Sequence, residues 1–144
     1  LTALPRLAKI ADARVLLVSM GSLATEATAA ADLLRETGLA VGVVGIRAYR
    51  PFPKEEVRSA LAGADAILVF EKDISYGYEG ALCTDLKAAL YGTGIDAPMR
   101  NFIAGLGGRD VKATELVEAA EAALGEIGKG RREKAATWLN CVTE

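Results

Sequence analysis

The sequence predicts a three-layer α/β/α fold built on a mostly parallel sheet of four to five strands. Three observations lead to this fold class. Short apolar segments of strand length recur four times along the 144 residues, each is followed by a segment whose apolar residues have helical spacing, and glycines or prolines separate the two. Parallel strands need a crossover, which is usually a helix, so repeated strand-then-helix units favour a parallel sheet with helices on both faces.

The four predicted strands are nearly continuous apolar runs rather than alternating patterns. The clearest is 14–20, Arg-Val-Leu-Leu-Val-Ser-Met, which is typical of a strand covered on both faces. The right-handed crossover rule leaves few arrangements of such strands. We expect the spatial order 41–47, 14–20, 66–72 and 99–105, with any N-terminal strand at the edge beside 41–47.

Apolar residues at helical spacing occupy the segments between the strands. They predict helices at about 23–37, 53–62, 79–90 and 114–127. Ser22 is placed to cap the first helix, and Gly38 and Gly63 are placed to end the first two. Pro53 suits the first helical position of the second, because its missing N–H has no intrahelical partner there.

The chain divides into three parts. Residues 1–12 are expected to be a linker or an edge strand, 13–128 to form the α/β domain, and 129–144 to be a C-terminal tail in which Trp138 is a docking anchor. The chain starts without Met and without the charge pattern of a signal peptide. We therefore expect it to continue a larger protein.

Composition excludes several classes of function. The net charge of −2 gives no basic excess for nucleic acid or an anionic membrane, and no apolar run reaches the roughly 20 residues that span a bilayer. Histidine is absent, and Cys83 and Cys141 lie far apart, so no zinc site or iron–sulfur cluster is expected from this chain alone. We expect both cysteines to be free thiols in a reducing cytoplasm rather than joined in a disulfide.

Unusual residues gather in the connections that follow the strands. In a parallel sheet these connections meet at one edge, where ligands and partners usually bind. The candidate contact residues are Arg47, Tyr49, Arg50, Pro51, Phe52, Pro53, Glu71, Lys72, Gly77, Gly80, Gly107, Gly108, Arg109 and Asp110. The alternative is that these loops only pack on one another.

Several of these residues have a plain structural interpretation beside a functional one. The glycines at 105–108 resemble a phosphate-binding loop, but without the usual spacing or lysine a tight turn with positive φ is favoured. Arg109 and Asp110 suggest a local ion pair. Glu71 either orients neighbouring backbone, binds a partner's cation or forms a surface ion pair. Arg50 is expected to pair with a carboxylate in its own loop or across an interface.

Catalytic groups are not expected in this chain. Glu79 stands at a helix start, where it would complement the helix dipole, and Cys83 lies beside an apolar stripe, where it is expected to be buried. The sequence contains no recognisable nucleophile–base pair, acid–base dyad or metal set, so no residue is assigned a catalytic role.

Three motifs in register resemble a known family. They are 46–53 (Ile-Arg-Ala-Tyr-Arg-Pro-Phe-Pro), 70–90 (Phe-Glu-Lys-Asp-Ile-Ser-Tyr-Gly-Tyr-Glu-Gly-Ala, followed by Thr-Asp-Leu-Lys-Ala-Ala-Leu) and 101–111 (Asn-Phe-Ile-Ala-Gly-Leu-Gly-Gly-Arg-Asp-Val). Their order and separation resemble the alpha chain of pyruvate:ferredoxin oxidoreductase over about residues 13–127. The C-terminal domain of a transketolase or of a dehydrogenase beta chain is a weaker match.

The resemblance implies a transketolase C-terminal-like domain within a thiamine-diphosphate enzyme. Such an enzyme oxidatively decarboxylates a 2-oxoacid to acyl-CoA and reduces ferredoxin. The resemblance implies that the holoenzyme uses thiamine diphosphate, Mg, iron–sulfur clusters and CoA, that other domains or subunits bind them, and that these are the partners of this chain. The alternative is an independent small-ligand or regulatory module that shares the fold.

Overall fold

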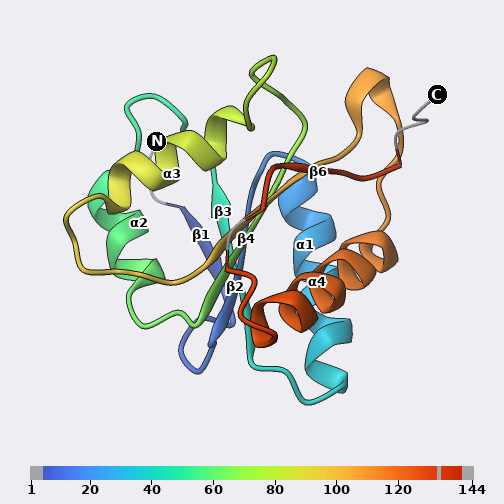
Figure 1. Cartoon of the computed structure of the whole chain (residues 1–144), viewed down its shortest axis with the longest axis horizontal. Coiled ribbons are helices and arrows are strands. Elements are labelled where there is room, and N and C mark those ends of the chain that lie inside the picture. Colours follow the sequence, from blue (N-terminus) through green and yellow to red (C-terminus); the bar gives the residue numbers. More distant parts are fainter. Residues whose placement is uncertain (1–4, 133, 141–144) are drawn as a thin grey trace.

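The computed structural model describes residues 5–132 and 134–140 and consists of one sheet between two layers of helices (Figure 1). The strands are β1 (Arg6–Ala8), β2 (Val15–Met20), β3 (Val41–Ile46), β4 (Ala66–Glu71), β5 (Met99–Ile103) and β6 (Thr137–Trp138). The helices are α1 (Leu23–Glu36), α2 (Lys54–Leu61), α3 (Ala81–Leu90), the 3₁₀ helix η1 (Leu106–Gly108) and α4 (Ala113–Gly128).

The strand order is β1-β3-β2-β4-β5-β6. The predicted order of the four main strands is confirmed, and all three of their pairings are parallel. β1 runs antiparallel to β3 at one edge. The sheet has six strands where four to five were expected, because β6 adds a parallel pairing of two residues to β5.

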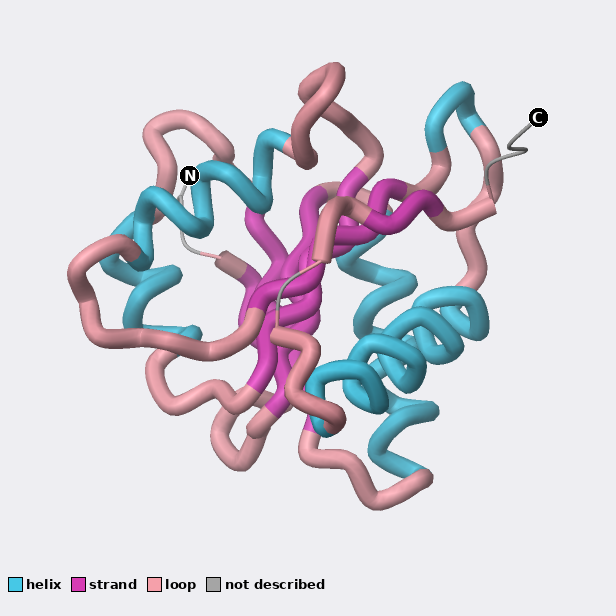
Figure 2. Tube along the Cα trace, viewed as in Figure 1, coloured by secondary structure: helices cyan, strands magenta, loops and turns pink. Residues whose placement is uncertain are grey.

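The two faces of the sheet carry separate apolar clusters. On one face, Leu17 and Phe70 pack under α1 and α4, and the Phe70 ring stacks on Phe102 with 4.7 Å between centroids. On the other face, Leu16 and Val69 pack under α2 and α3. Figure 2 shows α1 to α4 on these two faces, and the loops with the short η1 at the ends of the strands. Burial on both faces explains why the strands are apolar without alternation.

One predicted helix cap and one predicted helix start are wrong. Ser22 does not cap α1 with its side chain, because its backbone is itself helical (φ −61°, ψ −30°), which is not the extended conformation of a capping residue. The third helix begins at Ala81 rather than at 79, because Gly80 has extended backbone (φ −69°, ψ 152°). The predicted stops at Gly38 and Gly63 are confirmed, with φ of 91° and 81°.

The segment after α4 returns to the sheet. The Leu139 N–H donates to the Ile103 carbonyl oxygen at 2.8 Å, and β6 pairs with β5 just before it. Trp138 remains 47% exposed. The Leu139 side chain packs against the cluster under α1 and α4, so this part of the chain docks through Leu139 and backbone hydrogen bonds, and the indole is only partly covered.

Candidate functional site

Three long connections meet at the edge where the parallel strands end. They follow β3, β4 and β5 and span 47–53, 72–80 and 104–112, respectively. All three lie at the top of the view in Figure 1. Every candidate contact residue lies on one of them or, like Glu71, at the end of a strand that leads into one. The fold thus brings the candidate residues to one edge of the sheet, and their role as an interface stays a prediction.

The connection after β3 packs on its own domain. The rings of Tyr49 and Phe52 meet edge to face with 6.0 Å between centroids, and both are partly buried against the cluster under α2 and α3. The Arg50 guanidinium lies 4.0 Å from the centre of the Tyr49 ring and pairs with Asp85 of α3 at 2.8 Å. The expected carboxylate partner of Arg50 therefore lies on a neighbouring helix, and the Arg50–Pro51 peptide bond is cis.

Glu71 is the buried polar centre of this edge. It ends β4, it is 1% exposed, and its carboxylate accepts hydrogen bonds from the N–H groups of Leu82 (2.7 Å) and Cys83 (3.1 Å). The Asn101 side chain donates a third bond at 2.6 Å. The carboxylate therefore sits at the N-terminus of α3, where backbone N–H groups have no intrahelical partner. Of the three roles considered for Glu71, orientation of the backbone is confirmed and the surface ion pair is wrong.

Gly80 makes room for this carboxylate. A Cβ atom at position 80 would lie 2.0 Å from Cδ of Glu71, and the Gly80 N–H donates to Oδ1 of Asn101 at 3.0 Å. Glycine is needed here because a side chain would meet the Glu71 carboxyl, and not because of its backbone angles (φ −69°, ψ 152°). Asn101 is not among the predicted contact residues, and its only signal in the sequence is that, with Arg100, it places polar residues inside a buried strand.

Burial raises the pKa of the Glu71 carboxyl to about 7, while the N–H groups of Leu82 and Cys83 and the Asn101 side chain act in the opposite direction. The nearby Asp73 carboxylate raises the pKa further. The carboxyl group of Glu71 therefore changes charge near neutral pH.

Glu79 forms a second buried cluster beside the first. It is 7% exposed and accepts from Lys87 Nζ at 2.5 Å and from the Thr84 hydroxyl at 3.1 Å, both on α3. The expected role of Glu79 at the start of the helix is thus filled by Glu71, and Glu79 instead ties the connection to the side of α3.

The connection after β4 presents two exposed aromatic rings. Tyr76 is 98% exposed and Tyr78 is 66% exposed, and the turn between them is made by Gly77 with φ of 76°. The base of this connection is held by Glu71 and Glu79, whereas its tip faces solvent. Gly77 and Gly80 are among the predicted contact residues and the two tyrosines are not, although a large aromatic residue at a loop tip is itself a signal for an interface.

The glycine-rich segment after β5 is a turn. Gly105, Gly107 and Gly108 have φ of 72°, 68° and 78°, as the structural interpretation predicted. The expected ion pair between Arg109 and Asp110 is wrong: Arg109 donates to the Asn140 carbonyl, and Asp110 accepts from the Val111 N–H at 3.1 Å. The turn thus serves to hold the C-terminal segment.

Cys83 is buried, as expected, with 1% exposure. Burial raises the pKa of its thiol to about 12, and the neighbouring Glu79 carboxylate adds to the effect. Since the thiolate is the reactive form, Cys83 is expected to resist thiol reagents at pH 8 in the folded protein. In a Cys141→Ser background, a disulfide reagent should label fewer than about one tenth of the molecules before urea is added and all of them afterwards. Rapid labelling without urea would contradict this burial.

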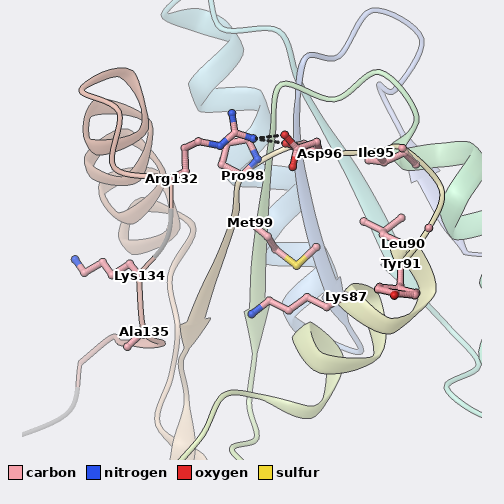
Figure 3. Close-up of a pocket in the computed structure, with 13 residues that line it drawn as sticks. Lys87, Leu90, Tyr91, Ile95, Asp96, Pro98, Met99, Arg132, Lys134 and Ala135 are labelled. Carbon is pink, nitrogen blue, oxygen red and sulfur yellow. Dashed lines mark hydrogen bonds and ion pairs between the residues drawn. The ribbon is translucent and has the colours of Figure 1, made fainter.

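The opposite edge of the sheet holds a groove of about 800 Å³ between α3, the start of β5 and the C-terminal segment (Figure 3). Met99 lies between Lys87 and Arg132 in this view. Both of these cations are already paired, Lys87 with Glu79 at 2.5 Å and Arg132 with Asp96 at 3.0 Å. The groove therefore offers no unpaired charge from these two residues and is not assigned as the site.

Two other features are absent from the part of the chain that the structure describes. Its His, Cys, Asp and Glu side chains form no group of three or more that could hold a metal ion. Its helices include none that is long and apolar enough to cross a membrane.

The fold and this edge define a class of protein: a three-layer α/β domain whose strand-end connections carry a buried carboxylate and exposed aromatic residues. Residues 13–116 match the family model described as pyruvate:ferredoxin oxidoreductase core domain II. The chain belongs to this family, as the resemblance of its three motifs predicted.

Curated relatives agree with the family. The chain is 43% identical over 128 residues to the pyruvate synthase subunit PorA of Pyrococcus abyssi, covering 89% of this chain and 32% of that one. It is 39% identical over 131 residues to the ketoisovalerate oxidoreductase subunit VorA of Pyrococcus horikoshii, covering 91% and 33%. The chain thus spans about a third of the length of the curated relatives it matches.

Solved structures show the same fold. The alpha chain of a probable 2-oxoacid ferredoxin oxidoreductase from Thermoplasma acidophilum matches with a TM-score of 0.50 and 25% identity, covering 86% of this chain and 99% of that one. A split-gene transketolase, described as an inactive beta4 tetramer, matches with a TM-score of 0.59 and 21% identity over 77% of this chain and 38% of that one. The second match supports the predicted transketolase-like fold alone.

Proposed function

We propose that this chain is a non-catalytic assembly and positioning domain of a thiamine-diphosphate-dependent 2-oxoacid:ferredoxin oxidoreductase. The observation that carries the proposal is the exposure of Tyr76 and Tyr78 on a connection whose base is held by buried carboxylates. A large aromatic side chain on a well-held loop loses little conformational entropy when it is buried by a partner.

Unpaired cations accompany these tyrosines. Arg47 and Lys72 are exposed at the same edge. Their side chains make no hydrogen bond or ion pair with the residues that the structure describes. Aromatic residues and arginine are the side chains most enriched at the centre of protein interfaces. Because the curated relatives are about three times as long as this chain, the partner that we propose is the remainder of the same enzyme.

In this proposal the chemistry belongs to that remainder. The enzyme would decarboxylate a 2-oxoacid oxidatively to acyl-CoA in the cytoplasm and pass electrons to ferredoxin. Since this chain spans about a third of the length of its curated relatives, thiamine diphosphate, Mg, iron–sulfur clusters and CoA would be bound by other domains or subunits of the enzyme. The strand-end edge would hold the neighbouring domains in the geometry that the reaction requires.

The test is the double replacement Tyr76→Ala and Tyr78→Ala in the complete enzyme. We expect the variant to assemble at least about tenfold more weakly, because aromatic hot-spot residues of an interface cost about 2 kcal/mol or more when truncated and tenfold corresponds to about 1.4 kcal/mol. Dissociation on dilution, followed by size-exclusion chromatography with light scattering, measures assembly, and 2-oxoacid-dependent reduction of ferredoxin measures turnover in parallel.

Tyr91→Ala is the matched control. Tyr91 is 88% exposed, like Tyr76, but it follows α3 and lies at the opposite edge of the sheet. It should leave assembly and turnover unchanged. Assembly and turnover that are equal in all three proteins would refute the proposed interface, and turnover by the isolated 144-residue chain would refute its non-catalytic role.

A further inference from the structure

A pocket of about 580 Å³ lies at the strand-end edge, over β1, β3 and the beginning of α1. Its two charged residues come from different strands. The antiparallel β1 places Arg6 opposite Gly45 of β3, and Arg47 directly follows β3. The rest of the lining, apart from Ile46, is formed by the small residues Gly21, Ala24, Thr25 and Gly45.

Both arginines of this pocket are exposed and unpaired. Neither the Arg6 nor the Arg47 side chain makes a hydrogen bond or an ion pair within the described part of the chain. Arg14, for comparison, is also exposed but pairs with Asp65 at 2.7 Å. No carboxylate lines the pocket, and Glu26, the acidic residue in the first turn of α1, is paired with neither arginine. The pocket therefore carries two positive charges without an internal counter-ion.

Two glycines keep the pocket open. A Cβ atom at Gly45 would lie 3.2 Å from Cβ of Ala24 and 3.6 Å from Cβ of Arg6, so a side chain here would fill the space between α1 and β1. At Gly21 nothing lies within 4 Å of an added Cβ atom. A compact group can therefore approach the two guanidinium groups without displacing a side chain.

We propose that this pocket binds a phosphate monoester, whose dianionic group pairs with Arg6 and Arg47. A phosphate monoester carries nearly two negative charges at neutral pH, which matches two guanidinium groups, whereas a carboxylate would neutralise only one of them. Planar guanidinium groups also match the geometry of phosphate oxygens, to which each can donate two parallel hydrogen bonds. The Thr25 hydroxyl in the lining is a further donor.

The volume of the pocket indicates what is attached to the phosphate. One water molecule occupies about 30 Å³ in the liquid, so a phosphate group of five non-hydrogen atoms fills only about a quarter of the space. The remaining lining, which includes Ala24 and Ile46, carries no charge. The ligand class is therefore the phosphate monoester of a small, uncharged organic molecule.

This site goes beyond the proposed function and shares only Arg47 with the proposed interface. Tyr76 and Tyr78 lie on the connection after β4, whereas the pocket lies over β1 and β3. Binding of a small phosphate by the 144-residue chain alone needs no partner. Either proposal can therefore fail without the other.

An NMR titration of the isotope-labelled 144-residue chain with methyl phosphate tests the proposal. We expect saturable shifts of the backbone amide signals of Gly21, Ala24 and Gly45. Dimethyl phosphate and acetate, which carry one negative charge each, should bind at least about tenfold more weakly. Equal binding of all three anions would mean an adventitious ion only and would overturn the proposal, as would shifts centred on another part of the chain or no shifts at all.

Charge variants locate the binding. Arg6→Met and Arg47→Met each remove one guanidinium and should weaken methyl phosphate binding at least about tenfold. Arg131→Met should leave it unchanged. Arg131 is also exposed and makes no ion pair with the described residues, but it follows α4, and its carbonyl accepts from Arg100 near the start of β5, at the opposite edge of the sheet. Unchanged binding in both pocket variants would refute the assignment.

A pair of variants at Thr25 tests the pocket without removing either arginine. Thr25 is exposed, so both replacements are compatible with folding, which the dispersion of the NMR signals verifies. Thr25→Glu places a carboxylate in the lining and should abolish saturable binding of methyl phosphate. Thr25→Gln has a similar shape without the charge and should change the affinity less than about threefold. Equal binding by these two variants would also overturn the proposal.

Discussion

Gly80→Ala is expected to lower the free energy of unfolding by about 3 kcal/mol, the sum of a steric cost and of hydrogen bonds lost inside the fold. The added methyl carbon would lie 2.0 Å from Cδ of the Glu71 carboxyl, so the carboxyl must move. Its movement would leave the N–H groups of Leu82 and Cys83 without their acceptor. Urea unfolding followed by circular dichroism measures the loss.

Two controls separate the contact from the general effect of replacing a glycine. Gly125 of α4 has no atom within 4 Å of its added Cβ, so Gly125→Ala should be neutral or stabilise the helix by about 0.5–1 kcal/mol. Gly80→Ala should also cost less in a Glu71→Ala background, because the clash is then gone. An equal cost in both backgrounds would show that the carboxyl of Glu71 is not what Gly80 accommodates.

The second large effect is a dependence of stability on pH that originates at Glu71. The folded-state pKa of about 7 exceeds the ordinary value of 4.5, so the folded protein holds this proton more tightly than the unfolded chain. The stabilisation is complete below about pH 4.5 and is lost as the pH rises through about 7. At about 1.4 kcal/mol per pKa unit, the loss amounts to about 3 kcal/mol.

Glu71→Gln isolates this contribution, because glutamine has a similar shape and no titratable proton. The difference in unfolding free energy between the native protein and Glu71→Gln should shift by up to about 3 kcal/mol in favour of the variant between about pH 4.5 and about pH 8. Other titrating groups cancel in this difference. A difference that is independent of pH, or that grows in favour of the native protein as the pH rises, would contradict the raised pKa.

Local pattern was sufficient for the four main strands, β2 to β5, and for most helix bounds. The runs at 14–20 and 41–47 are continuous and apolar because both faces of β2 and β3 are covered. The apolar pattern of each segment is therefore enough to predict a strand that is buried on both faces. The start of the third helix was misplaced by two residues, since Glu79 resembles a residue of a first helical turn. Its backbone neighbour Gly80 is extended because a carboxylate from another strand occupies the helix end.

The candidate site was predicted in its place but not in its contacts. Parallel topology was enough to bring Arg47, Glu71 and Arg109 to one edge. Tyr49 and Phe52 are predicted contact residues; both are partly buried against the cluster under α2 and α3, and their role at an interface stays a prediction. Tyr76 and Tyr78 are the large aromatic residues that are exposed at this edge. The sequence alone does not indicate which of the connections packs over a helix and which has a tip in solvent.

The sequence by itself determined the order of the elements, the parallel sheet and the family, because each rests on periodicity or on motifs read within one segment. Only the tertiary structure decided that Glu71 is enclosed by Gly80 and Asn101 and that Arg100 is buried with part of its guanidinium unpaired. These properties arise between residues up to about thirty positions apart in the chain. Their charge, burial and hydrogen bonding depend on the path of the intervening backbone, which no local pattern specifies.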